Sequence, residues 1–137
     1  MTYGALLSSK LVGEGKYDQA IEAANSEIDL HPDEPEAYFN RGQARVALDC
    51  FADAAQDYTK ALSMDMGASS LDPETVDDEL FFALRNLASQ QRSDPAAAVE
   101  ILNRYRQILP QGRHLDDIQK WADSFNGVET VWYRERI

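Results

Sequence analysis

Residues 17–20 of the chain read YDQA, and residues 51–54 read FADA, 34 positions further along. Both stretches place an aromatic residue three positions before an alanine, and each begins a segment with regularly spaced apolar residues. When the chain is shifted by 34 positions, Leu7 falls on Arg41 and Ala24 falls on Tyr58. Because a fixed period of about 20 to 50 residues indicates a repeat architecture, this pair of stretches decides the expected fold.

A third unit emerges when 44 further positions are added, since Ala54 then falls on Ala98 and Met66 falls on Pro110. This shift exceeds the first period by ten positions, which indicates an insertion between the second and third units. We therefore predict repeats at residues 1–34, 35–68 and 79–112, with residues 69–78 inserted.

Each unit is expected to contain two helices. Apolar residues recur with the period of an α-helix within residues 17–28, 51–62 and 98–109. An acid followed by a proline, at residues 72–73 and 94–95, combines a helix cap with a proline at the first helical position. Sustained strand-like alternation is missing except over residues 128–132. The sequence therefore predicts an all-α chain.

The spacing and the residue types resemble the tetratricopeptide repeat family, whose 34-residue unit is a helix–turn–helix. The resemblance is closest over residues 37–44, which read AYFNRGQA. The chain also resembles the family in having an aromatic residue after each turn and small residues where the two helices of a unit cross. These positions are Tyr17, Phe51, Ser8, Gly42, Ala20, Ala54, Ala61 and Ala98. The chain departs from the family pattern at Gly4 (normally large), Glu27 (normally small) and Met66 (normally proline).

The resemblance implies an α-α superhelix over residues 1–125, a tetratricopeptide solenoid of three helix–turn–helix repeats. Apolar residues within 113–125 are expected to form a C-terminal helix that caps the exposed end of the solenoid. Residues 126–137 form a C-terminal tail. Because apolar and aromatic residues are unusual at a free end, we expect this tail to dock on its own protomer or on a neighbouring copy.

Proteins of this family are typically non-catalytic scaffolds, in which the first helices line a concave groove for a peptide or a partner's helix. The resemblance implies that the partner contacts are Ser9, Phe39, Asn40, Gln43, Leu84 and Leu87. The two leucines are equally compatible with an ordinary core. The two amides are expected to be exposed, because amides are seldom buried without hydrogen-bond partners.

A groove that clamps the C-terminal carboxylate of a chaperone is not expected. Of the residues that form such a clamp in this family, only Asn40 matches. The remaining clamp positions hold Ala5, Ser9, Leu80 and Leu84, which cannot supply positive charge. An apolar groove of this kind is better suited to an amphipathic helix or a hydrophobic segment, with a few amides fixing its register.

The charge balance limits the classes of partner. The chain has 24 Asp and Glu residues against 13 Lys and Arg residues, for a net charge of −11. Such a surface repels phosphate backbones and anionic lipid headgroups, so we expect neither a nucleic-acid nor a membrane partner. Residues 1–10 do not read as a secretory signal, and the single cysteine suits a reducing compartment. We expect a cytoplasmic protein.

No motif in the sequence predicts an enzyme, a cofactor or a metal site. The five acids of residues 72–79 lack the order of a calcium loop, and acids at a helix start complement the helix dipole. His31, His114 and Cys50 do not follow metal-ligand spacing, and no phosphate-binding loop or nucleophile elbow is present.

A self-associating, homo-oligomeric module is the alternative to a partner-binding adaptor. Five arginines lie between residues 85 and 113, whereas residues 1–60 hold 11 acids against 5 bases. This asymmetry and the C-terminal tail could drive head-to-tail stacking of copies. Ion pairs within one chain explain the same asymmetry more simply.

Overall fold

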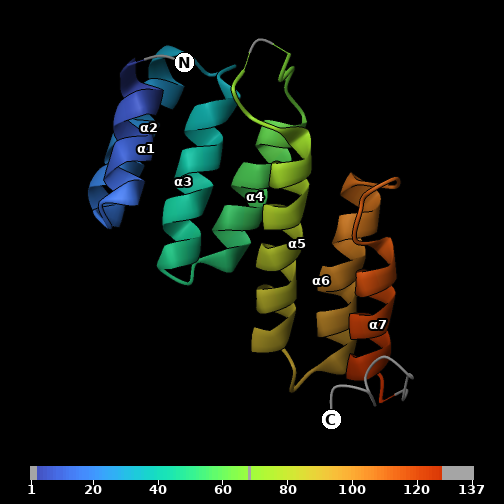
Figure 1. The fold of residues 1–137 in the computed structure, drawn as a ribbon. Helices are drawn as coiled ribbons and strands as arrows, with labels where there is room; N and C mark the ends of the chain where they lie inside the picture. The colour runs from blue at the N-terminus through green and yellow to red at the C-terminus, as the bar shows by residue number, and fades with distance from the viewer. Residues whose placement is uncertain (1–2, 68, 128–137) are drawn as a thin grey trace. The chain divides into compact units, whose positions relative to one another are not determined.

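The computed structural model describes residues 3–67 and 69–127. These residues form seven helices and no strand, so the prediction of an all-α chain is confirmed (Figure 1). The segment 128–132 and the C-terminal tail from residue 128 lie outside the described residues. The helices are α1 (Tyr3–Gly13), α2 (Tyr17–Leu30), α3 (Pro35–Ala47), α4 (Phe51–Leu62), α5 (Pro73–Gln90), α6 (Pro95–Ile108) and α7 (Leu115–Phe125).

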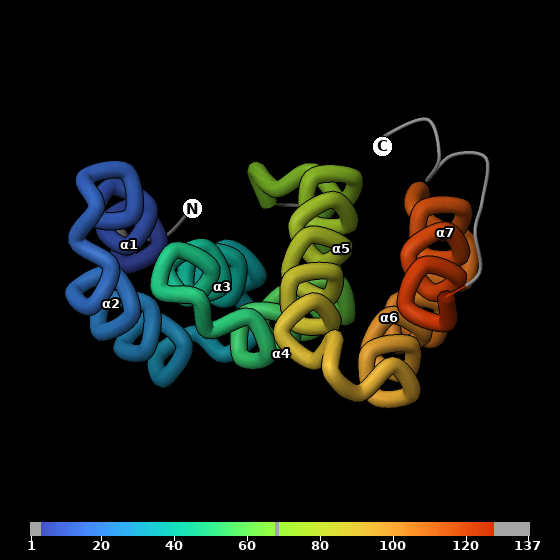
Figure 2. The backbone as a smooth tube through the Cα atoms, turned by 90° about the horizontal axis from the view of Figure 1, so that it is seen from below, coloured from blue at the N-terminus to red at the C-terminus, as the bar shows by residue number. Residues whose placement is uncertain are grey.

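The chain forms two compact units, Met1–Leu80 and Phe81–Ile137, and the boundary between them falls within α5. In the first unit α2 packs against α1, α3 packs against both of them, and α4 packs against α3 (Figure 2). In the second unit α6 packs against α7. The pairs α1–α2, α2–α3, α3–α4 and α6–α7 follow one another in sequence and are neighbours in space, as expected for helical hairpins.

The turns of the first two hairpins have the same hydrogen bonds, one repeat period apart. The N–H of Lys16 donates to the carbonyl five residues earlier at 2.9 Å, and the N–H of Cys50 does the same at 2.8 Å. The preceding residues, Gly15 and Asp49, have positive φ angles of 75° and 60°. This is the Schellman ending of a helix, which requires a left-handed residue. Aspartate tolerates that conformation better than most side chains, so it can replace glycine there.

Small residues allow the helices of the first unit to approach closely. The alanines at the crossings are fully buried, and a Cβ on Gly42 would lie 2.7 Å from a ring carbon of the buried Tyr58. Glycine at this position of α3 therefore leaves room for the aromatic ring of α4. The buried alanines of α2, α3 and α4 are Ala20, Ala24, Ala37, Ala44, Ala54, Ala55 and Ala61.

The second unit is built around Tyr105 of α6. Its ring is fully buried, and its hydroxyl accepts a hydrogen bond of 2.9 Å from the N–H of His114. A Cβ on Gly112 would collide with that hydroxyl, so the loop between α6 and α7 needs glycine at this point. The His114 ring stacks on Phe81 with 4.3 Å between the ring centroids.

Acid–proline pairs begin two of the helices, as the sequence predicts. The carboxylate of Asp94 accepts a hydrogen bond of 3.2 Å from the N–H of Ala97 at the start of α6. Asp72 accepts one of 3.1 Å from the N–H of Glu74 at the start of α5. Because α5 begins at Pro73, residues 73–78 of the expected insertion are helical.

Candidate functional site

The predicted groove residues of the first unit differ in how far they reach solvent. Ser9 on α1 is exposed, and Phe39 and Gln43 on α3 are partly exposed. Helices α1 and α3 pack against each other, so these residues belong to neighbouring helices. We define the α1–α3 face as Ser9, Phe39 and Gln43.

Asn40 does not belong to this face, and the expectation that it is exposed is wrong. Its side chain is only 7% exposed, and its amide nitrogen donates to the carbonyl of Ala5 and to the Ser8 hydroxyl, both at 2.9 Å. A buried amide with two such bonds fastens α3 to α1. The sequence suggested exposure because the bonding partners lie on a different helix, a whole hairpin earlier in the chain.

Gln43 has a defined orientation, because the hydroxyl of Tyr58 donates a hydrogen bond to its Oε1. Burial raises the pKa of the Tyr58 phenol far above its ordinary value, and the charges on Glu79 and Asp57 raise it further. The phenol therefore keeps its proton and remains a donor. The amide nitrogen of Gln43 has no acceptor among the described residues of the chain. It is available to donate to another molecule.

The aromatic ring of Phe39 supplies the apolar part of the α1–α3 face. It lies 5.7 Å from the Tyr58 ring, centroid to centroid, with the ring planes tilted by 49°. Such a tilted pair is a favourable aromatic geometry, which holds Phe39 in place while leaving part of it exposed. An apolar ring and an amide donor therefore lie one helical turn apart on α3.

An ion network that sequence reasoning missed stabilises the helices that carry this face. Asp57 of α4 accepts from Arg41 at 2.7 Å and from Arg45 at 2.8 Å, and its side chain is only 3% exposed. Arg41 also donates to Asn25 of α2 at 2.9 Å. The network thus joins α2, α3 and α4. No pattern in the sequence pairs these charges, because their pairing depends on the packing of three helices.

The predicted contacts in the second unit are less accessible. Leu84 is 1% exposed and Ala83 is fully buried, so Leu84 is a core residue and its prediction as a partner contact is wrong. Leu87 is partly exposed and stays a predicted contact. Core packing was the alternative reading of both leucines in the sequence.

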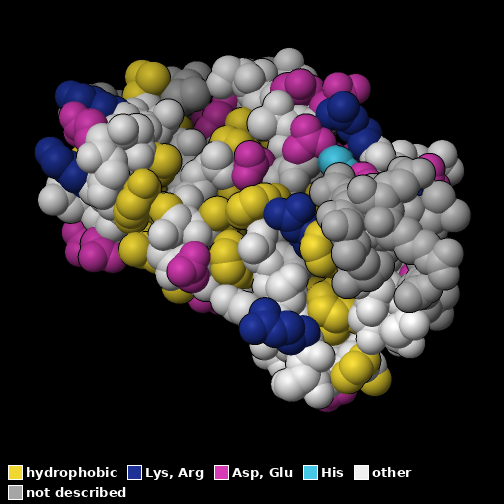
Figure 3. All heavy atoms as spheres, turned by 60° about the horizontal axis from the view of Figure 1, so that its bottom comes forward, with side chains coloured by type: hydrophobic (Ala, Val, Ile, Leu, Met, Phe, Trp, Pro, Cys, Tyr) yellow, Lys and Arg dark blue, Asp and Glu magenta, His cyan; other side chains and the backbone are white. Residues whose placement is uncertain are grey.

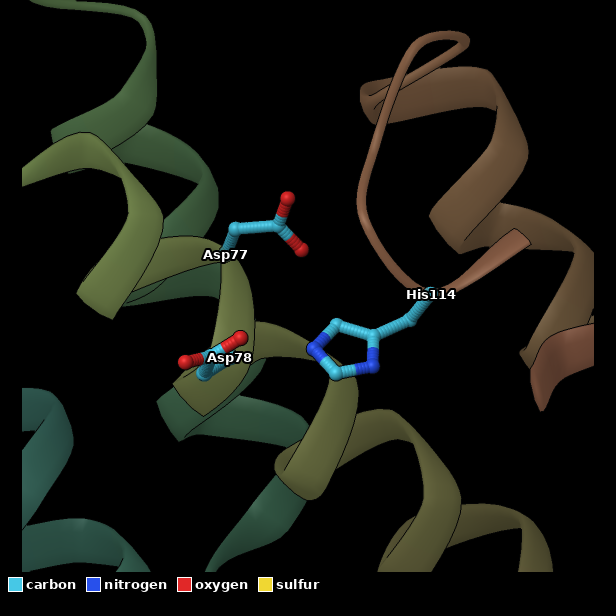
Figure 4. Close-up of side chains that lie close together, drawn as sticks. All are labelled: Asp77, Asp78 and His114. Carbon is cyan, nitrogen blue, oxygen red and sulfur yellow. The ribbon is translucent and has the colours of Figure 1, made fainter. Parts of the chain in front are cut away.

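Figure 4 shows three side chains of the types that can bind a metal ion, taken from the described residues. They are Asp77 and Asp78 of α5 and His114 before α7. The two aspartates belong to the first unit and the histidine to the second, so they define no site within either unit. Within its own unit, His114 Nδ1 lies 3.0 Å from Asp117 Oδ2 and the ring stacks on Phe81. These contacts give His114 a structural role.

Paired helices with repeated turns and small residues at their crossings define an α-helical repeat protein. Residues 7–70, from within α1 to beyond the end of α4, match the family model of the tetratricopeptide repeat. The resemblance found in the sequence is thereby confirmed. Tetratricopeptide repeats generally mediate protein–protein interactions. A search of the curated proteins found no match to the chain.

Proposed function

We propose that the chain is a non-catalytic adaptor that binds a segment of a partner protein on the α1–α3 face. The observation that carries this proposal is the Gln43 amide, which Tyr58 holds by its oxygen while the nitrogen has no acceptor among the described residues. A preoriented donor binds a partner at a lower entropic cost than a freely rotating one.

The chemistry of the face suits a segment that is largely apolar. Phe39 offers a partly exposed aromatic ring, and the neighbouring amide can hydrogen-bond a backbone carbonyl or a side-chain oxygen of the partner. Ser9 adds a small exposed hydroxyl on the adjacent helix. An amphipathic helix fits this combination, because its apolar side would cover the ring while its polar edge meets the amide. Asn40 supports the face from beneath by joining α3 to α1.

Composition supports a protein partner and a cytoplasmic location. A net charge of −11 disfavours nucleic acid and anionic lipid as partners. Among the described residues, no helix is long and apolar enough to span a bilayer. The single cysteine suits a protein of the reducing cytoplasm.

The test is affinity capture from a lysate of the source cells, with wild type compared to a Gln43→Glu variant. Glutamate can still accept the Tyr58 hydrogen bond, but it cannot donate one outward, so we expect the fold to persist and the partner to be lost. Gln56→Glu is the matched control, because Gln56 is exposed on α4 and receives the same change of charge. A Phe39→Ser variant should lose the partner as well.

Helical content and thermal melts establish that each variant is folded before capture. A partner that both α1–α3 variants retain as well as wild type would contradict the proposal. Capture of copies of the chain alone would favour the self-associating module instead.

A further inference from the structure

A pocket of about 440 Å³ opens beside α1 and α2, away from the α1–α3 face residues. Much of its wall is apolar, and Leu30 at its edge is 73% exposed. Figure 3 shows hydrophobic side chains reaching the surface in the part of the molecule that α1 to α4 form. The residues that line the pocket are Gly4, Leu7, Ala23, Ser26, Glu27, Leu30 and His31.

Glu27 is the charged group in the wall of this pocket. The residue is only 5% exposed, and its Oε1 atom is buried without a hydrogen-bond partner among the described residues. Its Oε2 atom lies where a side chain on Gly4 would begin, because a Cβ at that position would collide with it. A buried carboxylate oxygen without a partner is unfavourable, and a cation placed beside it would relieve that cost.

The second hairpin shows that the repeat does not need such a group. A shift of one repeat period takes Gly4 to Tyr38 and Glu27 to Ala61, both of which are buried. The equivalent positions of α3 and α4 thus hold a tyrosine and an alanine, whereas those of α1 and α2 hold a glycine and a glutamate. This reversal places a carboxylate in α2 where α4 has alanine. The buried carboxylate of Asp57 in α4 is paired with two arginines, whereas Oε1 of Glu27 has no hydrogen-bond partner among the described residues.

The surroundings of Glu27 are acidic as well. The pKa of Glu34 is raised by its hydrogen bond with Glu36, by burial and by the charge on Glu36, and the negative charge of Glu27 makes the smallest contribution. The negative charge of Glu27 thus reaches Glu34. A positively charged ligand would find a favourable potential at the pocket.

We propose that this pocket binds a lysine side chain presented by an apolar segment of a partner protein, with the ammonium group at Glu27. The alkyl stem of lysine would lie along the leucines of the wall, as such stems do on apolar surfaces. Arginine is disfavoured, because its bidentate geometry needs both carboxylate oxygens and Oε2 is packed against Gly4. A second copy is disfavoured by mutual repulsion, because each copy carries a net charge of −11. No residue of the α1–α3 face lines this pocket.

The probes for this site are two helical peptides of about 15 residues that differ at one position. The first carries a single lysine in the middle of its apolar side, and the second carries norleucine, which keeps the stem and lacks the ammonium group. Binding is measured by titration with amide NMR of the full chain. We expect the lysine peptide to shift the amide signals of Ala23, Glu27 and Leu30 and to bind about tenfold more tightly than the norleucine peptide.

Glu27→Gln should abolish the preference for lysine. Glu22→Gln, an exposed residue of the same helix, should retain it. A Gly4→Tyr/Glu27→Ala double variant restores the arrangement of the second hairpin and should bind neither peptide at the pocket. It also serves as a folded control if Glu27→Gln alone is unstable.

Equal affinity of wild type for the two peptides would overturn the proposal, and so would a lysine preference that survives in both Glu27 variants. Self-association of wild type that disappears on Glu27→Gln would overturn it in favour of a second copy. Loss of the partner on Gln43→Glu has no bearing on these outcomes, so the two proposals fail separately.

Discussion

The α1–α2 and α3–α4 hairpins have the same turn but present different chemistry on the equivalent side. In the second hairpin this side carries Arg41, Arg45 and Asp57, which form a network that reaches Asn25 of α2. A shift of one repeat period replaces these three charged residues by Leu7, Leu11 and Ala23. These positions are thus charged in the second hairpin, where the neighbouring helix α2 adjoins them. They are apolar in the first hairpin, where no described helix covers them.

A repeat period therefore specifies the backbone of a hairpin, while the neighbouring helices determine which side chains suit its surface. The apolar side of the first hairpin borders the pocket that contains Glu27, and a second hollow lies along Leu11 and Glu22. The two hairpins should therefore respond differently to substitutions at equivalent positions. Their differences are testable one at a time.

The largest effect is expected from Asp57→Asn. This change removes the charge that pairs with Arg41 and Arg45 and leaves two partly buried guanidinium groups without their carboxylate. We expect a loss of about 3 kcal/mol in the free energy of unfolding, measured by urea denaturation. Asp53→Asn, on an exposed position of the same helix, should cost a small fraction of that. Equal losses for the two variants would show that the network contributes little.

Gly42→Ala should have the next largest effect. The new Cβ would lie 2.7 Å from a ring carbon of Tyr58, which is fully buried. We expect a net loss of about 2 kcal/mol, because overpacking outweighs the better helix propensity of alanine. The control in the first hairpin is Gly13→Ala, where a Cβ would meet nothing within 4 Å. Thermal melts of the two variants should shift in opposite directions.

Asn40→Ala tests the hydrogen bonds that join α3 of the second hairpin to α1 of the first. This variant loses two buried hydrogen bonds from α3 to α1 and should be destabilised by about 1 to 2 kcal/mol. Asn86→Ala removes only a bond to a carbonyl four residues earlier in α5, so its cost should be smaller. Chemical denaturation of both variants measures the difference. If Asn40→Ala lowers the free energy of unfolding no more than the control does, the packing of α3 on α1 does not depend on this amide.

The turns offer a test with a gain in stability. Asp49 has a φ of 60°, at the position that Gly15 occupies in the first hairpin. Asp49→Gly should stabilise the chain by about 0.5 to 1 kcal/mol, because glycine reaches this conformation without steric cost. The reverse change, Gly15→Asp, should destabilise it by a similar amount. Melting temperatures that move in the same direction for both variants would contradict the equivalence of the two turns.

The smallest expected effect concerns Glu79, whose negative charge acts on Tyr58 of the second hairpin. Burial raises the pKa of the Glu79 carboxyl, and the charge on Asp78 raises it further. The folded state therefore holds this proton more tightly than the unfolded state, and stability falls as the pH rises through the raised pKa. Glu79→Gln should raise Tm at neutral pH by on the order of 1 °C.

That gain should shrink as the pH falls toward about 4.5, where the carboxyl is increasingly protonated in both states. Exposed Glu22→Gln should show no comparable trend. Scanning calorimetry across this range separates the two cases. A constant gain at all pH values would mean that the carboxyl does not titrate as its burial implies.

The sequence alone determined the helical hairpins, their turns and the caps of α5 and α6. These features depend on residues within a few positions of one another, such as the acid–proline pairs and the hydrogen bond from Lys16 to a carbonyl five residues earlier. The repeat period was visible for the same reason, because equal local patterns produce equal local structure.

Only the tertiary structure decided which of the predicted groove residues are accessible. Asn40 is buried because its partners lie on α1, a whole hairpin earlier in the chain, and Gln43 is oriented by Tyr58 of the following helix. The buried charge of Glu27 depends on the missing side chain of Gly4, which belongs to the preceding helix. The burial and bonding of these side chains come from helices packed side by side, and the spacing of residues along one helix does not specify which atoms of the next helix they meet.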